Sequence, residues 1–193
     1  MSGRPREFDE HAVLETAMDV FWEQGYEATG IAELSERCGI GRQSMYNTFG
    51  DKRTLFDQAL ELYRTERIGE VTALLDRPGS PVENIHALLD AWESSWASGD
   101  DRGCLMVNAM AELGDRDAET KSKLDRMVQT VEDALYRTLR RAQEVGDLPA
   151  DRDARALART ITITGQGLAV VGKVSSSPTY AKDVLDTTRT LLK

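Results

Sequence analysis

Apolar side chains recur three and four residues apart along nearly the whole chain, and this spacing places them on one face of an α-helix. Glycines such as Gly25, Gly39 and Gly50 interrupt the pattern, and glycine commonly follows the end of a helix. Few segments show the sustained alternation that is typical of strands. The sequence therefore predicts an all-α fold of about nine helices.

Start and stop signals give approximate bounds to these helices. Ser80, Pro81 and Glu83 form a helix-start signature, with serine as the cap and proline in the first turn. The segment 160–164 alternates like a strand, but helical spacing holds over the longer window around it, so a helix is predicted there. The expected helices cover residues 9–24, 29–38, 41–49, 52–76, 81–97, 105–113, 117–145, 155–173 and 180–192.

The net charge restricts the partners that the chain can have. The 193 residues carry a formal charge of −9, which argues against binding of nucleic acid over the whole surface, because phosphate affinity comes from lysine and arginine. Residues 1–54 contain six basic and ten acidic side chains. If this region binds DNA, its positive charge must gather on one face while the acidic groups point away.

Targeting segments, disulfides and metal sites are not indicated. No apolar run approaches the roughly 18 residues that a membrane-spanning helix needs, and the N-terminal residues are polar, unlike a secretory signal. Cys38 and Cys104 stand far apart without CxxC or Cys/His spacing. We expect a cytoplasmic protein with no cofactor and no membrane partner.

Two short predicted helices, 29–38 and 41–49, are separated by a glycine turn, which is typical of a helix-turn-helix. In this motif the second helix enters the major groove and its N-terminal residues meet the base edges. Arg42, Gln43 and Ser44 occupy those positions, and Asn47 follows one turn later on the same face. Arginine can bind guanine, and glutamine or asparagine can bind adenine, through paired hydrogen bonds. These four residues are the predicted readers of sequence.

Around this motif, Gly25-Tyr26 is followed by Thr29, a small residue precedes Gly39, and the pattern Tyr46-x-x-Phe49-x-x-Lys52 follows. Over about the first 60 residues, these features resemble the DNA-binding domain of the TetR/AcrR family of repressors. This resemblance implies that Thr29 belongs to the DNA-binding surface. It also implies that Tyr46 and Lys52 contact phosphates, which positions a protein without reading bases.

The sequence departs from the family pattern at two positions, and a weaker DNA-binding signal lies in the N-terminal arm. Gly30 and Gly41 stand where the family often has hydroxyl residues, so a cap or phosphate contact at each is in doubt, although glycine tolerates cap geometry. Arg4 and Arg6 lie in the polar arm 1–8. An arm of this kind can reach into the minor groove.

The chain is predicted to contain two domains, a DNA-binding domain at 1–52 and a helical domain at 53–193. The resemblance implies that the second domain senses a ligand and forms a homodimer, and a twofold dimer can read two half-sites of fixed spacing. Small residues on one side of the helix 155–173 would let two helices approach closely. The predicted interface residues are Gly165, Leu168, Ala169, Gly172 and Leu185.

The effector pocket is expected among large or adaptable apolar side chains of the middle helices, which suit an apolar ligand but also suit an ordinary core. Cys104 as an oxidation sensor would need exposure and a lowered pKa, with Arg102 as its one basic neighbour in sequence. Cys38 is expected in the core. The predicted ligand-binding residues are Phe56, Tyr63, Trp92, Trp96, Met106, Asn108, Met110 and Met127.

These features predict a transcriptional repressor that binds a palindromic operator in double-stranded DNA as a homodimer and leaves it when a small apolar effector binds. Two alternatives stay open. An enzyme would depend on carboxylates alone, because the two histidines and two cysteines are isolated and no phosphate loop is present. A helical protein-interaction module would have no use for Arg42, Gln43 and Asn47 on the groove-facing side.

Overall fold

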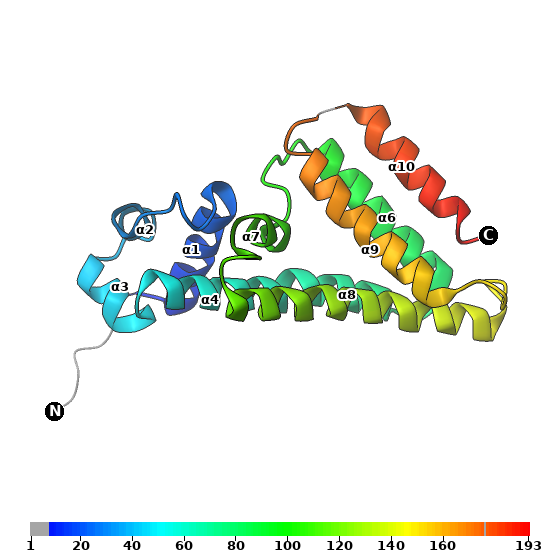
Figure 1. The fold of residues 1–193 in the computed structure, drawn as a ribbon, viewed down its shortest axis with the longest axis horizontal. Coiled ribbons are helices and arrows are strands. Elements are labelled where there is room, and N and C mark those ends of the chain that lie inside the picture. Colours follow the sequence, from blue (N-terminus) through cyan, green and yellow to red (C-terminus); the bar gives the residue numbers. More distant parts are fainter. Residues whose placement is uncertain (1–7, 176) are drawn as a thin grey trace.

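The computed structural model describes residues 8–175 and 177–193, and every regular element in these ranges is a helix. The predicted all-α fold is confirmed. Helices α1 to α3 lie at one end of an elongated molecule and α6, α9 and α10 lie at the other (Figure 1). The elements are α1 (Glu10–Gln24), α2 (Ile31–Arg37), α3 (Arg42–Phe49), α4 (Lys52–Tyr63), η1 (Arg64–Ile68), α5 (Gly69–Leu75), α6 (Pro81–Ala97), α7 (Leu105–Leu113), α8 (Ala118–Val145), α9 (Ala154–Val171) and α10 (Pro178–Thr190).

The helices α4 and α5 form one continuous rod, joined by the π-helical segment η1. With this rod counted once, the described part of the chain holds nine helices, as predicted. The rod and α8 run beside each other and connect the two ends of the molecule (Figure 1). The spacing of apolar residues does not reveal the π-helical segment, because one wider turn changes the hydrogen-bond pattern without breaking the helix.

Local hydrogen bonds explain why two debatable segments are helical. The Ser80 hydroxyl accepts a hydrogen bond from the Glu83 amide at 3.3 Å, as the start signature predicted. In α9 the hydroxyls of Thr160, Thr162 and Thr164 each donate to the carbonyl four residues earlier, at 2.9 Å. These bonds satisfy the threonine hydroxyls within the helix, so the β-branched side chains are compatible with a helical backbone.

The buried apolar side chains form two cores. The first joins α1 to α4 with η1, α7 and the first half of α8, and the second joins α5, α6, the second half of α8, α9 and α10. Leu55, Phe56 and Leu60 of α4 belong to the first core. Packing in this core thus joins the helices of the predicted DNA-binding domain to the rod and to α7. A movement in the larger domain can therefore reach the helix-turn-helix.

None of the described helices combines the length and the apolar character that crossing a bilayer requires.

Candidate DNA-binding surface and effector cavity

The turn between α2 and α3 has the geometry of a helix-turn-helix. Gly39 has φ of +66°, a left-handed conformation that favours glycine. Leu34 of α2 and both Met45 and Phe49 of α3 are buried in the first core, which also contains residues of α1. Because α3 points these two side chains inward at a spacing of one turn, its remaining residues face solvent.

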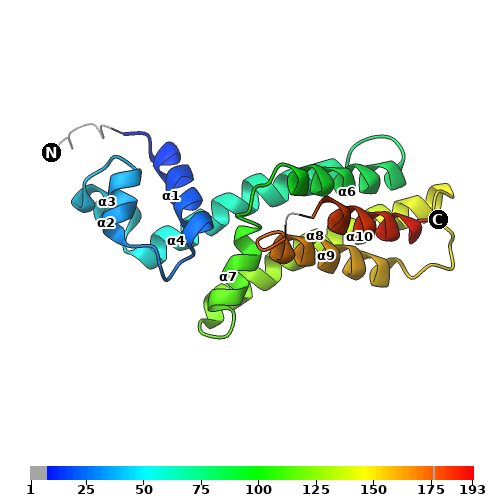
Figure 2. The ribbon, with the colours of Figure 1, turned by 90° about the horizontal axis from the view of Figure 1, so that it is seen from above.

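The exposed face of α3 carries the predicted reading residues. Arg42, Gln43, Ser44 and Asn47 are all exposed, and Tyr46 is 47% exposed. The Gln43 amide donates to Asn47 Oδ1 at 2.9 Å, which holds two amide side chains together on this face. Helix α3 lies at the end of the molecule opposite α10 (Figures 1 and 2). The geometry leaves this face free to enter a groove.

Helix α3 contains no acidic residue, and several acidic groups of the surrounding elements have partners of their own. Glu23 of α1 pairs with Arg37 at 3.1 Å, and Asp19 pairs with Arg102 at 3.1 Å. Asp51 caps α4, and hydrogen bonds from the backbone and hydroxyl of Thr54 hold the pKa of its carboxyl below the usual value. The unfavourable net charge of the N-terminal region is therefore not concentrated on the reading face.

Two residues carried over from the family motif have structural positions. Thr29 is 1% exposed and its hydroxyl donates to the Gly25 carbonyl at 2.6 Å, so its side chain is not available to DNA. This corrects the prediction that Thr29 contacts the operator. Lys52 donates to the carbonyl of Thr29 at 2.9 Å and lies 4.3 Å from the Tyr26 ring centroid. Its ammonium thus fastens the α1–α2 turn to α4. The predicted arm residues Arg4 and Arg6 lie outside the described residues.

A cavity of about 700 Å³ lies where α6, α9, the rod and the α6–α7 loop meet. Four predicted ligand residues line it, namely Tyr63, Trp92, Trp96 and Met106. The prediction missed Trp22, which reaches the cavity from α1. Trp22 lies in the predicted DNA-binding domain 1–52, and helical periodicity cannot show that a side chain of this helix reaches the neighbouring domain.

The other four predicted ligand residues lie elsewhere. Phe56 packs in the first core with its ring centroid 5.0 Å from that of Phe21. Met127 is buried in the same core and Met110 packs against it. Asn108 donates to the carbonyl of Arg102 at 3.0 Å and so supports the α6–α7 loop. Phe56, Met110 and Met127 therefore belong to the helical core and not to the cavity wall.

The small residues of α9 allow close approach, but within the subunit. A Cβ on Gly165 would lie 2.6 Å from the Trp92 ring, and one on Gly172 would lie 3.4 Å from the Trp96 ring. Leu168 and Ala169 line the same cavity, and Leu185 is fully buried in the second core. All five predicted interface residues therefore face the interior of the subunit.

Comparison with known proteins decides what kind of protein this is. The model of bacterial regulatory proteins of the tetR family matches residues 13–59, and that of the tetracyclin repressor-like C-terminal domain matches residues 81–188. The chain belongs to the TetR family. It is 33% identical to the HTH-type transcriptional regulator YezE of Bacillus subtilis, over 98% of this chain and 99% of that protein.

Two further proteins are similar to this one over nearly the whole chain. The HTH-type transcriptional repressor ComR of Escherichia coli is 30% identical over 96% of this chain and 90% of its own length. A solved structure of the regulator CifR with a 26-base-pair operator DNA is 32% identical, with a TM-score of 0.79 and 98% coverage of both chains. The protein is thus a DNA-binding transcriptional regulator of the TetR family, and this family and these relatives are regulators rather than enzymes.

The loop between α6 and α7 holds α1 beside the cavity. Arg102 pairs with Asp19 and lies 4.5 Å from the Trp22 ring, while the Trp22 indole donates to the Gly103 carbonyl at 3.1 Å. Gly103 has φ of +68°, and a Cβ there would lie 2.6 Å from the Ala169 carbonyl oxygen. The loop therefore packs between α1 and α9, where a larger residue would not fit.

Helix α7 makes a second contact with the DNA-binding region. The Glu112 carboxylate accepts hydrogen bonds from the backbone amides of Tyr26 at 2.8 Å and Glu27 at 2.7 Å. Gly25, with φ of +84°, turns the chain so that these amides face α7. Hydrogen bonds to a charged group are stronger than neutral ones. Glu112 therefore holds the turn before α2.

We expect Glu112→Ala to lower the free energy of unfolding by about 1–3 kcal/mol, because two amides lose a charged acceptor. Glu112→Gln keeps one carbonyl acceptor and should lose less. Urea unfolding followed by circular dichroism measures both. An alanine variant as stable as the unchanged protein would show that Glu112 does not hold the turn.

Cys38 packs against the first core, and burial raises the pKa of its thiol to about 11. At pH 8 about 0.1% of such a thiol is ionised, and the thiolate is the reactive form. We expect Cys38 in the folded protein to resist labelling by a thiol reagent at this pH and to react once urea unfolds the chain. Mass spectrometry of the labelled peptides measures this, and rapid native labelling would contradict the burial.

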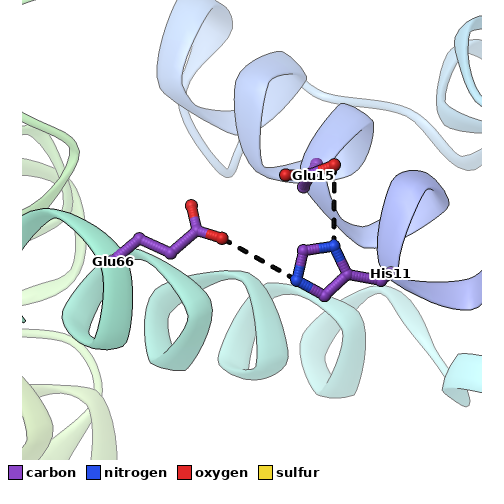
Figure 3. Close-up of side chains that lie close together, drawn as sticks. All are labelled: His11, Glu15 and Glu66. Carbon is purple, nitrogen blue, oxygen red and sulfur yellow. Dashed lines mark ion pairs between the residues drawn. The ribbon is translucent and has the colours of Figure 1, made fainter.

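His11 links α1 to η1 through two carboxylates (Figure 3). Its Nδ1 lies 3.6 Å from Glu15 and its Nε2 lies 3.8 Å from Glu66. These are the only three side chains of the described residues whose grouping could hold a metal ion. Each nitrogen faces a different carboxylate and the group is largely exposed, so we assign it a weak contact between helices and no metal.

Proposed function

We propose that this protein is a ligand-responsive repressor that binds a palindromic operator as a homodimer in the cytoplasm and leaves it when a small, mainly apolar effector fills the cavity. One observation carries the proposal. The cavity wall includes Trp22 of α1 together with residues of α6 and α9, so an occupant touches the DNA-binding end and the larger domain at once.

Exposed apolar residues on the outer face of α9 support the proposal that the protein forms a dimer. Ile163 is 66% exposed and Val170 is 52% exposed, with the exposed Gly167 between them at helical spacing. An exposed apolar stripe of this kind favours contact with another protein surface. A second copy fits it best, because a twofold pair presents two α3 helices to one duplex.

The α6–α7 loop supplies a route from effector to DNA. The Gly103 carbonyl accepts a hydrogen bond from the Trp22 indole of α1, and a Cβ added to Gly103 would meet the backbone of α9. A ligand that separates α9 from this loop would shift α1, and α3 would move with it through their shared core. The effector can change operator affinity only by binding one of the two arrangements more tightly.

Titration of the protein against labelled DNA from the region flanking its own gene tests the proposal. We expect a complex that survives excess unrelated DNA and that weakens steeply as salt concentration rises. An apolar compound shown to occupy the cavity should dissociate this complex. Equal affinity for unrelated DNA, or cavity occupancy without any change in operator affinity, would contradict the proposed function.

A further inference from the structure

Most polar side chains around the cavity have partners within the chain. The Tyr63 hydroxyl contacts Cys104 Sγ at 3.1 Å, and burial raises the pKa of this phenol well above its usual value, so it stays protonated. The Trp96 indole donates to the Ser177 carbonyl at 3.1 Å, and the Thr162 hydroxyl donates within α9. The Trp22 indole is satisfied by the α6–α7 loop. None of these groups needs a ligand.

Gln166 differs from its neighbours. It lines the cavity from α9, and its Nε2 atom is buried without any hydrogen-bond partner. A buried donor without an acceptor is rare in folded proteins, because the group has lost its water without replacing it. The amide follows Gly165, the residue that lets the Trp92 ring lie against α9. The cavity therefore combines an aromatic wall with one donor that lacks an acceptor.

The charged residues at the cavity lie at its exposed rim. Arg67 pairs with Glu70 at 3.4 Å, and Asp100 pairs with Arg102 at 2.8 Å. Lys173 donates to the Asn108 side chain at 3.1 Å. The buried and half-buried residues that line the cavity are all neutral, so an ionised ligand would lose its water against them without gaining a counter-charge. An uncharged occupant is the one that this wall accepts.

We propose that the effector is an uncharged, mainly apolar molecule with a carbonyl oxygen that accepts a hydrogen bond from Gln166 Nε2. Its apolar body would lie against Trp92, Met106 and Leu168, which line the same cavity. A volume of about 700 Å³ suits a small organic molecule of one or two rings. This assignment rests on the proposed function of the cavity as the effector site, and it adds the chemical class of the ligand.

The test uses two probes of nearly the same shape, the ketone 1-tetralone and its hydrocarbon tetralin, which lacks the carbonyl. Calorimetry measures the affinity of each. Fluorescence reports where they bind, because all three tryptophans of the chain, Trp22, Trp92 and Trp96, line this cavity. The quantity compared is the ratio of the two affinities, so differences in hydration between the probes cancel between protein variants.

Gln166→Met removes the donor and keeps the length of the side chain. We expect its preference for 1-tetralone over tetralin to fall about 5- to 10-fold relative to the unchanged protein, the effect of one hydrogen bond. Gln129→Met, the same replacement on an exposed position of α8 outside the cavity, should leave the preference unchanged.

Equal preference in the unchanged protein and in Gln166→Met would overturn the assignment, and so would failure of both probes to bind. Operator binding by the same preparation would then show that the DNA-binding part of the proposed function holds although the proposed ligand class is wrong. A preference that depends on Gln166, combined with unchanged operator affinity, would support the ligand class and contradict effector release.

Discussion

Replacing Ile163 and Val170 of α9 together by glutamate is expected to convert the protein into a monomer and to weaken operator binding at least about a hundredfold. Both side chains are more than half exposed in the subunit. Burying an aliphatic side chain of this size stabilises by about 1.5–3 kcal/mol. Glutamates facing each other across a twofold axis would instead bury unpaired charges. A monomer reads only one half-site and loses the gain from simultaneous binding.

The matched control adds the same charge on another surface. Ala73 of α5 and Ala91 of α6 are exposed, so the double variant Ala73→Glu, Ala91→Glu changes net charge equally without touching α9. Sedimentation gives the oligomeric state and fluorescence anisotropy gives operator affinity. If the α9 variant stayed dimeric, or if the control lost as much affinity, the interface would have to lie elsewhere.

Arg42→Ala is expected to reduce affinity for the operator about 5- to 150-fold for each half-site contact, and to remove discrimination at one base pair in each half-site. Arg42 is the first residue of α3, is exposed, and is the one basic side chain of that helix. A guanidinium at the start of a recognition helix can bind guanine with two hydrogen bonds. Binding to a panel of operators with single base changes measures the lost discrimination.

Arg37→Ala is the control for this variant. It also removes one positive charge from the helix-turn-helix, but Arg37 pairs with Glu23 of α1 at 3.1 Å. Its loss should weaken all sequences slightly and equally. Identical profiles for the two variants would show that Arg42 contributes only charge.

The helices and the reading face could be predicted from the sequence because local chemistry determines them. Helix ends follow glycines and caps such as Ser80, which bind their own neighbours. The exposed face of α3 follows from Met45 and Phe49 pointing inward one turn apart. These features depend on residues close in sequence, so periodicity alone reveals them.

Long-range contacts could not be predicted in this way. The sequence predicts close approach of a partner helix at Gly165 and Gly172, whereas the side chains that lie against them are tryptophans of α6 in the same chain. Periodicity shows that a helix has a small-residue side and does not identify what packs there. The same limit applies to Thr29, a motif residue whose hydroxyl is used inside the fold.

The cavity shows this limit most clearly. Trp92 and Trp96 were expected there because they are large apolar residues on a middle helix. The sequence does not predict Trp22 in the cavity wall. It predicts Phe56 as a ligand residue, whereas Phe56 packs against Phe21 in the first core. All of these are aromatic residues on amphipathic helices. Which of them line the cavity and which lie in the core depends on how α1, the rod and α9 pack against one another.

Methylation interference on the operator tests the central claim most directly, that two α3 helices read one duplex. Methyl groups at guanine N7 block contacts in the major groove. We expect two symmetric groups of interfering guanines, one helical turn or a whole number of turns apart on one face of the DNA, and loss of one guanine from each group with Arg42→Ala. A single group of contacts, or a pattern unchanged by that substitution, would contradict that claim.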